Sequence, residues 1–516
     1  MQFVRVMKVV AVLPLLFYLA AVATAAAQGT APASPERFAG EATMGAQPPF
    51  PIHIELLRSA EAVTGTVSIA MGNFELVDAQ GDDTIVGRFE GAGGSGALTL
   101  RIDGDALTGA FDLAGQAGTI TATRTSEDAA AFFRPPEERL DLTADEWLAD
   151  LDRLFEILTR EHASPFHAVS SEQFEREAAR VRAAIPERDG VGIALEFRKL
   201  AALIGDGHTV LNLPHGRPRL PIAFFMFEDG LRVVRTSAAN EDMLGARLVS
   251  VDGVPVDRVI ERLNAYIPAH ETEWFLRAEL PGLLGNPDLL RAIGSGDETS
   301  FVFTFETTDG QQRLTLTDAE PGDEQVTLGG GAPLWQRNEK QGFWSERLAD
   351  GSLYVNWRSY GGLADGGAAL LESLDAEHPR RLIVDLRDND GGDYTVGRAF
   401  IDEIASRPWL NRRGVLYVMI GRETFSAAMT NAVDFKQKTE ATLVGEPAGA
   451  APNNWQEVRR FNLPNSALTV GVSTRYYEFL PGQPELRPDH LISPVPHDWG
   501  NVHDAGVAFV LEQPVP

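Results

Sequence analysis

The region after Gly351 alternates continuous apolar segments with amphipathic ones. The segments "SLYVNW", "RRLIVDL", "GVLYVMI" and "ATLVGE" are predicted to be strands, and "YTVGRAFIDEIA" and "SAAMTNAVDFKQK" to be helices. Strands that lack polar alternation are buried on both faces, which favours a largely parallel sheet covered by helices. In such sheets ligands sit beyond the carboxyl ends of the strands, where the chain turns into helices. We therefore expect the chemistry of this chain at those turns.

The chain has 516 residues, which is too long for a single hydrophobic core and predicts several domains. The segments before Gly351 have other hydrophobic patterns. Residues 28–128 contain short period-two segments such as "ALTLRID", which predict the half-buried antiparallel strands of a sandwich or barrel. Residues 129–141 are predicted to be a linker. Residues 142–215 carry apolar positions at helical spacing behind a capping box at Thr143 and Glu146, which predicts a small helical bundle.

The next segment, residues 216–325, returns to strands, and residues 326–516 contain the alternating α/β region. Within the former, "LGARLVSVDGVPVDRVIERLNAY" reads as a strand, an Asp-Gly turn and a helix, and it resembles the signature of a PDZ domain. That resemblance implies a groove that binds an extended peptide by strand addition. The expected fold class is therefore multidomain, with an all-β accessory domain, a helical bundle, a PDZ-like segment and an α/β core.

The start of the chain and its composition bound its location and partners. Residues 1–27 combine Arg5 and Lys8 with an apolar run and an alanine-rich exit, which predicts a cleaved export signal and a periplasmic or secreted protein. An uncleaved anchor is the alternative, although no stable membrane insertion is expected after signal removal. The chain has no cysteine for lipid attachment or disulfides. Its formal net charge of -28 repels polyanions and argues against nucleic acid as a partner.

Two turns between a strand and a helix carry the candidate chemistry. In "LIVDLRDNDGGDYTVG", Gly391 and Gly392 would let backbone N–H groups approach a ligand closely. In "MIGRETFSAAM", Ser426 stands where a helix begins, beside unsatisfied N–H groups that could stabilise an oxyanion. Serine is also among the commonest helix caps, so from the residues alone Ser426 is either a cap or a nucleophile.

A serine nucleophile needs a base that accepts its proton. Lys436 lies about 15 Å further along the predicted helix at the standard rise, and Lys438 is the last lysine of the chain. The later sequence therefore supplies no lysine base, and histidine is the remaining candidate. His208, in the small-residue turn "LIGDGHTVLNL", is either such a base or a capping or surface residue.

Three motifs, "LIVDLRDNDGG", "TFSAAM" and "ATLVGEPAGA", together resemble the ordered motifs of the C-terminal-processing and tricorn-type serine peptidases. The resemblance covers roughly residues 142–494 and implies a core like that of ClpP and crotonase. The C-terminal-processing branch places a catalytic lysine just after its "GExTxG" motif, where this chain has Ala450 and Ala451. The tricorn-like branch and many secreted bacterial relatives instead carry a histidine in a "DGHT"-type motif. Asp206 to Thr209 match this motif, and the match implies that His208 is the general base.

The same resemblance implies the other members of the site. Tricorn-type peptidases use a glutamate ahead of a "PD" pair, and "LPGQPELRPDHLISP" has Glu485 there, where it could orient the histidine. A polar residue precedes the tricorn histidine, whereas Gly207 stands here. The N–H groups of Ala427 and of Gly391 or Gly392 would form the oxyanion hole.

The expected function is that of an exported serine peptidase that cleaves peptide or protein substrates through an acyl-enzyme, with no metal or organic cofactor. Non-catalytic proteins that bind lipids or peptides share the fold, and an esterase-like hydrolase would use the same residues. Met429 stands where relatives often carry a glutamate. Asp388, Asp390 and Asp393 would place negative potential beside an oxyanion, unless they point outward or bind a basic substrate side chain.

Overall fold

The computed structural model describes residues 34–45, 49–59, 62–70, 72–91, 94–113, 115–134, 136–296, 299–318, 324–500 and 504–515. The predicted export signal, residues 1–27, lies outside the described residues. Contacts divide the chain into two compact units, Met1–Pro136 and Glu137–Pro516. None of the helices in the described ranges has the length and apolar character needed to cross a membrane.

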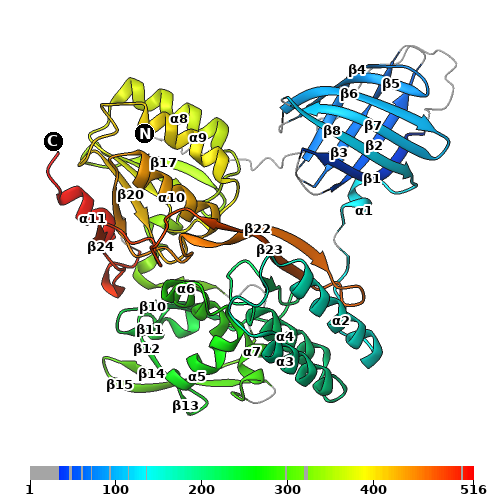
Figure 1. Ribbon diagram of the computed structural model, residues 1–516. Helices are drawn as coiled ribbons and strands as arrows, with labels where there is room; N and C mark the ends of the chain where they lie inside the picture. The colour runs from blue at the N-terminus through cyan, green and yellow to red at the C-terminus, as the bar shows by residue number, and fades with distance from the viewer. Residues whose placement is uncertain are drawn as a thin grey trace, which may run out of the picture. The chain divides into compact units, whose positions relative to one another are not determined.

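The N-terminal unit is a closed antiparallel barrel in which each strand pairs with the next and the last pairs with the first (Figure 1). The all-β prediction is confirmed, and of the two predicted alternatives, a sandwich and a barrel, the structure has the barrel. Alternate residues face inward, and Phe38, Ile54, Leu100 and Leu107 are fully buried there. The strands are β1 (Glu36–Met44), β2 (Phe50–Arg58), β3 (Val63–Ile69), β4 (Gly72–Gln80), β5 (Thr84–Gly91), β6 (Gly94–Asp103), β7 (Ala106–Leu113) and β8 (Gln116–Arg124).

A short helix, α1 (Ala129–Phe132), lies in the segment predicted to be a linker. Asp128 caps it, because its side chain accepts a hydrogen bond from the N–H of Ala131. The helix packs on the barrel through Phe132, whose ring lies 5.8 Å from that of His53. Nε2 of His53 is 2.9 Å from the carbonyl of Glu127, so this buried histidine ties the end of the barrel unit together.

The second unit begins with the predicted helical bundle, α2 (Ala144–Arg160), α3 (Ser171–Ala184) and α4 (Gly190–Ala202). The capping box is confirmed, because the Thr143 hydroxyl accepts from the N–H of Glu146 and the Glu146 carboxylate accepts from the N–H of Thr143. The buried faces of these helices pack around Trp147 and Phe197, whose rings meet edge to face at 5.7 Å.

A strand-rich segment follows, built on an antiparallel sheet of order β10-β11-β12-β14-β15, with β13 on β12 and β16 on β11. The Asp-Gly turn between β12 and β13 places Asp252 and Gly253 at φ 50° and 77°, as an Asp-Gly pair allows. The elements are β10 (Ile222–Phe227), β11 (Gly230–Ser237), β12 (Arg247–Val251), β13 (Val254–Pro255), α5 (Val256–Leu263), α6 (Glu273–Leu284), α7 (Pro287–Ala292), β14 (Phe301–Thr307), β15 (Gly310–Leu316) and β16 (Gln325–Thr327).

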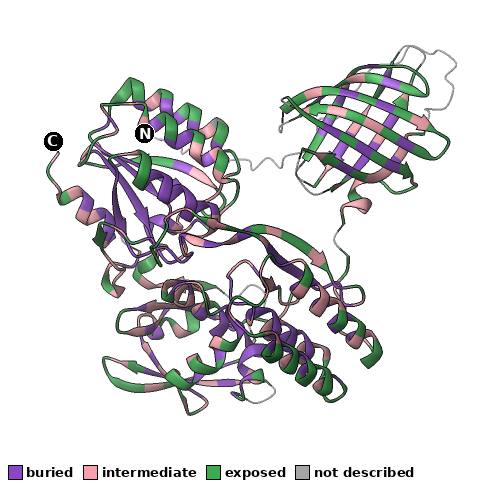
Figure 2. Ribbon diagram, viewed as in Figure 1, coloured by how far each residue is buried: buried purple, intermediate pink, exposed green. Residues whose placement is uncertain are grey.

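The alternating region forms a sheet of order β17-β18-β19-β20-β21-β24, parallel except for the edge pair β17 and β18. The predicted parallel sheet is confirmed, and β18 to β21 are buried along their whole length (Figure 2). The elements are β17 (Phe343–Arg347), β18 (Leu353–Trp357), α8 (Leu363–Glu377), β19 (Leu382–Asp385), α9 (Tyr394–Ala405), β20 (Leu416–Ile420), α10 (Ser426–Lys438), β21 (Thr442–Gly445), β24 (His490–Leu491) and α11 (Ala505–Glu512). Short 3₁₀ turns lie at Ile185–Glu187, Ala238–Met243, Asn264–Tyr266, Leu328–Gly330, Leu334–Gln336 and Pro496–Asp498.

A long hairpin joins the α/β sheet to the helical bundle (Figure 1). Its strands are β22 (Asn453–Asn462) and β23 (Thr469–Glu478), and β23 also pairs with the short strand β9 (Val210–Leu211). Leu468, Val470 and Val472 pack in the same core as the helices of the bundle. Because β9 comes directly after the "DGHT" turn, the hairpin fixes where that turn lies.

Candidate active site

Ser426 is the first residue of α10, and its backbone is strained. Its φ is 51°, in the left-handed region that costs a non-glycine residue about 1 kcal/mol or more. The N-cap of α10 is Phe425, and no side chain caps this end. The interpretation of Ser426 as a helix cap is therefore wrong. A serine at positive φ between a buried strand and a helix has the backbone arrangement of a nucleophile elbow, which exposes the hydroxyl.

The turn before Ser426 is held by buried hydrogen bonds. The hydroxyl of Thr424 donates to the carbonyl of Leu386 at 2.8 Å and accepts from the N–H of Gly421 at 2.9 Å. The N–H of Phe425 donates to the carbonyl of Asn389 at 3.0 Å. The strand ends of β19 and β20 are thus tied together, and this tie holds the strained conformation of Ser426.

The glycine pair lies directly against Ser426. Gly391 and Gly392 have φ of 121° and 150°. A Cβ added to Gly391 would lie 2.6 Å from Cβ of Ser426, 3.0 Å from its Oγ and 3.2 Å from the amide nitrogen of Ala427. The N–H of Gly391 donates to Oδ1 of Asn389 at 3.0 Å, so it is already occupied. The N–H groups of Gly392 and Ala427 have no acceptor among the residues that the structure describes.

His208 lies beside the residue that precedes the serine. Its ring packs on that of Phe425, with centroids 4.6 Å apart, and Phe425 also stacks on Phe275. Neither ring nitrogen of His208 meets hydrogen-bond geometry, although the backbone of Trp455 lies close enough to favour the protonated ring. Burial outweighs this and lowers the pKa of His208 to about 4. The ring is therefore neutral at pH 7 and able to accept a proton.

Glu485 lies in the segment between β23 and β24. Its Oε2 is 2.7 Å from a guanidinium nitrogen of Arg487, though outside hydrogen-bond geometry. Within the described residues its ion pair is with Arg487, and no hydrogen bond joins it to His208 or Ser426. The next residue, Leu486, is buried, and its carbonyl accepts from the N–H of Ala448 at 3.1 Å. The segment that carries Glu485 is thus joined to the "GEPAGA" loop.

Glu271 is a member of the site region that the sequence did not indicate. Its carboxylate accepts from the N–H of Gly207 at 2.9 Å and from the N–H of Ala451 at 3.1 Å. The adjacent Thr272 caps α6 and donates to the carbonyl of Gly449 at 2.7 Å. Burial raises the pKa of Glu271 to about 7. The start of α6 therefore joins the histidine turn to the "GEPAGA" loop, and "PAHETEW" carries no motif that would have shown it.

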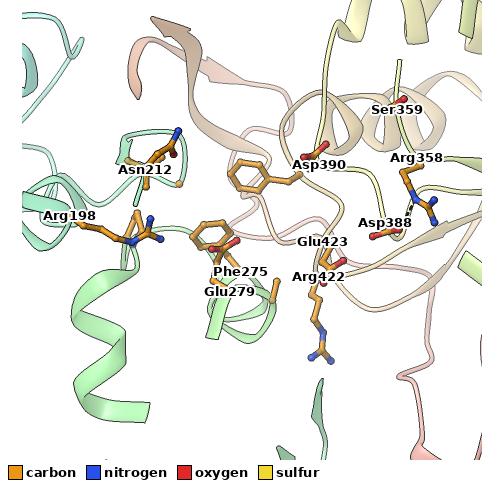
Figure 3. A pocket seen from close by; sticks show the side chains of 15 residues that line it. Arg198, Asn212, Phe275, Glu279, Arg358, Ser359, Asp388, Asp390, Arg422 and Glu423 are labelled. Atoms are coloured by element: carbon orange, nitrogen blue, oxygen red, sulfur yellow. Dashed lines mark hydrogen bonds and ion pairs between the residues drawn. The ribbon is translucent and has the colours of Figure 1, made fainter. Parts of the chain in front are cut away.

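A cavity of about 690 Å³ adjoins these turns (Figure 3). Its wall includes Gly207 and Phe425, which precede His208 and Ser426 in the chain. The remaining lining comes from the helical bundle, the strand-rich segment and the α/β sheet: Arg198, Val210, Asn212, Pro268, Phe275, Ala278, Glu279, Arg358, Ser359, Asp388, Asp390, Arg422 and Glu423. A cavity of this size, next to a serine and a neutral histidine, is where a substrate would bind.

The acidic residues of the cavity are partly neutralised. Asp388 accepts from Nε of Arg358 at 2.7 Å (Figure 3). The cavity residue Arg422 is paired with Glu446, which lies outside the lining, through both carboxylate oxygens at 2.8 and 2.6 Å. Glu423 lies within reach of Asp388, and burial together with the charge of Asp388 raises the pKa of Glu423 to about 8. The carboxyl of Glu423 beside Asp388 is therefore protonated at pH 7. Asp393 instead caps α9 by accepting from the N–H of Thr395.

Replacing Glu423 by glutamine should stabilise the protein at high pH only. The pKa of Glu423 is about 8 in the folded chain against an ordinary value of 4.5, so the folded state binds the proton more tightly than the unfolded state. Stability therefore falls as pH rises from about 4.5 to about 8, and an amide that mimics the protonated carboxyl escapes this loss. In calorimetry, Glu423→Gln should melt about 3 °C above the wild type at pH 9 and together with it near pH 4. Glu346→Gln, at an exposed position of β17, serves as control, and a constant difference at both pH values would contradict the assignment.

Comparisons with known proteins place the fold. No protein-family model matches the chain, and no curated protein matches its sequence. Among solved structures, mature CPAF complexed with lactacystin matches at 12% identity and a TM-score of 0.50, over 69% of this chain and 95% of that one. Mature CPAF matches at 13% identity and a TM-score of 0.50, over 72% and 96%. The tricorn protease matches at 12% identity and a TM-score of 0.36, over 87% and 49%. The chain therefore shares the fold of mature CPAF.

Proposed function

We propose that this chain is a serine peptidase in which Ser426 is the nucleophile and His208 is the general base. The observation that carries the proposal is the positive φ of Ser426 at the start of α10. There the serine lies against Gly391, and the phenylalanine before it packs on a neutral histidine. A non-catalytic binding protein needs neither the strained serine nor the histidine beside it. The fold shared with mature CPAF is consistent with this function.

The reaction would follow the acyl-enzyme course. Ser426 Oγ attacks the carbonyl carbon of the scissile peptide while a ring nitrogen of His208 takes the hydroxyl proton. The resulting oxyanion would accept hydrogen bonds from the N–H groups of Ala427 and Gly392, which have no acceptor among the described residues. His208 then gives the proton to the leaving amine and activates a water that hydrolyses the ester. Gly391 acts by its lack of a side chain rather than as a donor.

The proposal requires a small rearrangement of the rings. In the structure His208 packs on Phe425, and neither of its nitrogens is hydrogen-bonded to Ser426. Catalytic hydrogen bonds are often loose in the absence of substrate and tighten in the Michaelis complex. Phe425 and Phe275 line the cavity, so a bound substrate would contact them, and their movement would bring the imidazole to the hydroxyl.

Glu485 enters the proposal as a carboxylate that orients His208 after such a rearrangement. The resemblance of "PELRPD" to the tricorn-type motif supports this role, and so does its place beside the "GEPAGA" loop. The same proposal includes export of the chain, a PDZ-like peptide groove around β12, β13 and α5, and a ClpP- and crotonase-like α/β core. Peptides or proteins are the proposed substrates.

A fluorophosphonate probe tests the serine-hydrolase assignment without a known substrate. The folded protein should be labelled at one residue, and mass spectrometry of the digested adduct should locate the label on Ser426. A folded protein that is never labelled would reject the assignment in favour of a binding protein. Cleavage of denatured casein, set against hydrolysis of short-chain esters, then separates a peptidase from an esterase that uses the same residues.

A further inference from the structure

Asp206, two residues before the proposed base, is buried and accepts four hydrogen bonds. Its Oδ1 accepts from the N–H groups of His208 and Thr209, each at 3.0 Å, and from the hydroxyl of Ser473 at 2.6 Å. Its Oδ2 lies 2.9 Å from Nε2 of His162. The side chain is 2% exposed. One carboxylate thus holds the main chain of the histidine turn, the β22–β23 hairpin and the loop after α2.

The hydrogen bonds of His162 show which nitrogen carries its proton. Nδ1 of His162 accepts from the N–H of Ser164 at 2.9 Å, so this nitrogen is not protonated. The neutral ring therefore has its proton on Nε2, which donates to Asp206. All four donors to Asp206 are consequently neutral, and no arginine or lysine of the described ranges forms an ion pair with it. Its negative charge is stabilised by hydrogen bonds and is not cancelled by a cation.

The charge of Asp206 acts on the ring of His208. Burial alone would raise the pKa of Asp206, but the hydrogen bonds from His162, Ser473 and Thr209 outweigh it and keep the carboxylate ionised. At His208, burial lowers the pKa, Asp206 opposes this, and Arg460 acts in the same direction as burial. The other titratable groups around the turn are His167, which stacks on His162 at 5.5 Å, His270 and Glu271.

We infer that Asp206 is a positioning residue for His208: it fixes the backbone of the histidine turn and supplies the negative charge that stabilises the imidazolium as Ser426 is acylated. The inference rests on the proposed function. In a catalytic triad a carboxylate touches the imidazole directly. Here the carboxylate acts through two main-chain N–H groups and through its field, without a hydrogen bond to the ring. Nothing in this role depends on Glu485.

The test measures the rate constant of fluorophosphonate labelling from pH 2 to pH 9 in the full-length protein, because the pKa of His208 is already about 4 in the wild type. Asp206→Asn keeps the shape and the acceptor on Oδ1 but removes the charge. Its plateau rate should fall at least about tenfold, and the midpoint of the pH profile should move down by about one unit, because the imidazolium loses a nearby anion. Titration of the His208 ring by NMR in a Ser426→Ala background should show the same downward shift.

A matched control exists in the same region. Asp150 on α2 is also fully buried, and its carboxylate accepts from the N–H of Asn465, from the Asn465 side chain and from the N–H of Ser466 at 2.8 to 2.9 Å. It therefore ties the bundle to the same hairpin but does not touch the histidine turn. Asp150→Asn should lower the melting temperature and leave the midpoint of the pH profile unchanged.

The outcomes separate this inference from the proposed function. If the folded wild type is not labelled, the proposed function fails. If the wild type is labelled and Asp206→Asn keeps its plateau and midpoint, the serine hydrolase stands and the inference is overturned. If Asp206→Asn does not fold, Ser473→Ala and His162→Phe carry the test, since each removes one donor from a different oxygen. At least one of them should lower the plateau threefold or more, and unchanged plateaus in both would overturn the inference.

Discussion

Replacing Ser426 by alanine should reduce kcat/KM for casein-derived peptides by about 10⁶, and adding His208→Ala to that variant should reduce it no further. The two side chains act on one proton transfer, so once the hydroxyl is gone the base has nothing to deprotonate. His208→Ala alone should cost about 10⁴ or more. Initial rates with the purified proteins, normalised to the folded fraction, measure all three variants.

Two controls isolate the chemistry from the surroundings. Ser359→Ala removes a hydroxyl from the wall of the same cavity and should leave kcat/KM within about threefold. His215→Ala removes an exposed imidazole and should have no effect. Hydrolysis that survives in Ser426→Ala, or losses of Ser426 and His208 that multiply in the double variant, would show that the two do not act as a unit.

Gly391→Ala should inactivate the protein through geometry rather than through lost chemistry. At φ 121° an alanine is strained, and its Cβ would lie 2.6 Å from Cβ of Ser426, closer than carbon atoms approach. Either the serine or the glycine turn must move, and displacements of about 1 Å in an active site cost roughly 10²-fold. We expect labelling of Ser426 to slow at least 100-fold, with an additional loss of about 1 to 3 kcal/mol in the free energy of unfolding.

Gly482→Ala is the matched control for backbone strain. Gly482 has φ 77°, but a Cβ added there meets no atom within 4 Å. This variant should lose about 1 kcal/mol of stability and keep the full labelling rate. If Gly391→Ala is labelled as fast as Gly482→Ala, the close approach of the glycine turn to Ser426 does not affect the reactivity of the serine.

Much of the fold follows from local patterns in the chain. The period-two segments of the barrel, the capping box at Thr143 and the apolar strands of the α/β sheet are encoded within a few residues each, and all are present. The sequence did not distinguish a closed barrel from a sandwich, because closure depends on the pairing of β1 with β8, which are far apart in the chain.

The site was less accessible from the sequence. Whether Ser426 caps the helix or takes a nucleophile-elbow conformation at its start depends on φ, and the turn is held by the hydrogen bond from Phe425 to Asn389, which follows strand β19. Asp206 belongs to the "DGHT" motif, but no sequence pattern indicates its hydrogen-bond partner Ser473, which lies 267 residues later in the chain. Glu271 lies in a segment without a motif, and the Asp388–Glu423 pair forms between two motifs whose contact only the fold reveals.

The β22–β23 hairpin also sets the order in which the site can form. Asp206 and Ser473, which it joins, are 267 residues apart in the chain, so their contact closes a very long loop. Such contacts carry a large entropy cost and form late in folding. A growing polypeptide would already contain the histidine turn while the serine and the hairpin were still to be synthesised. The protein would therefore have no assembled centre during its own synthesis, and folding of its last third would act as the step that switches the activity on.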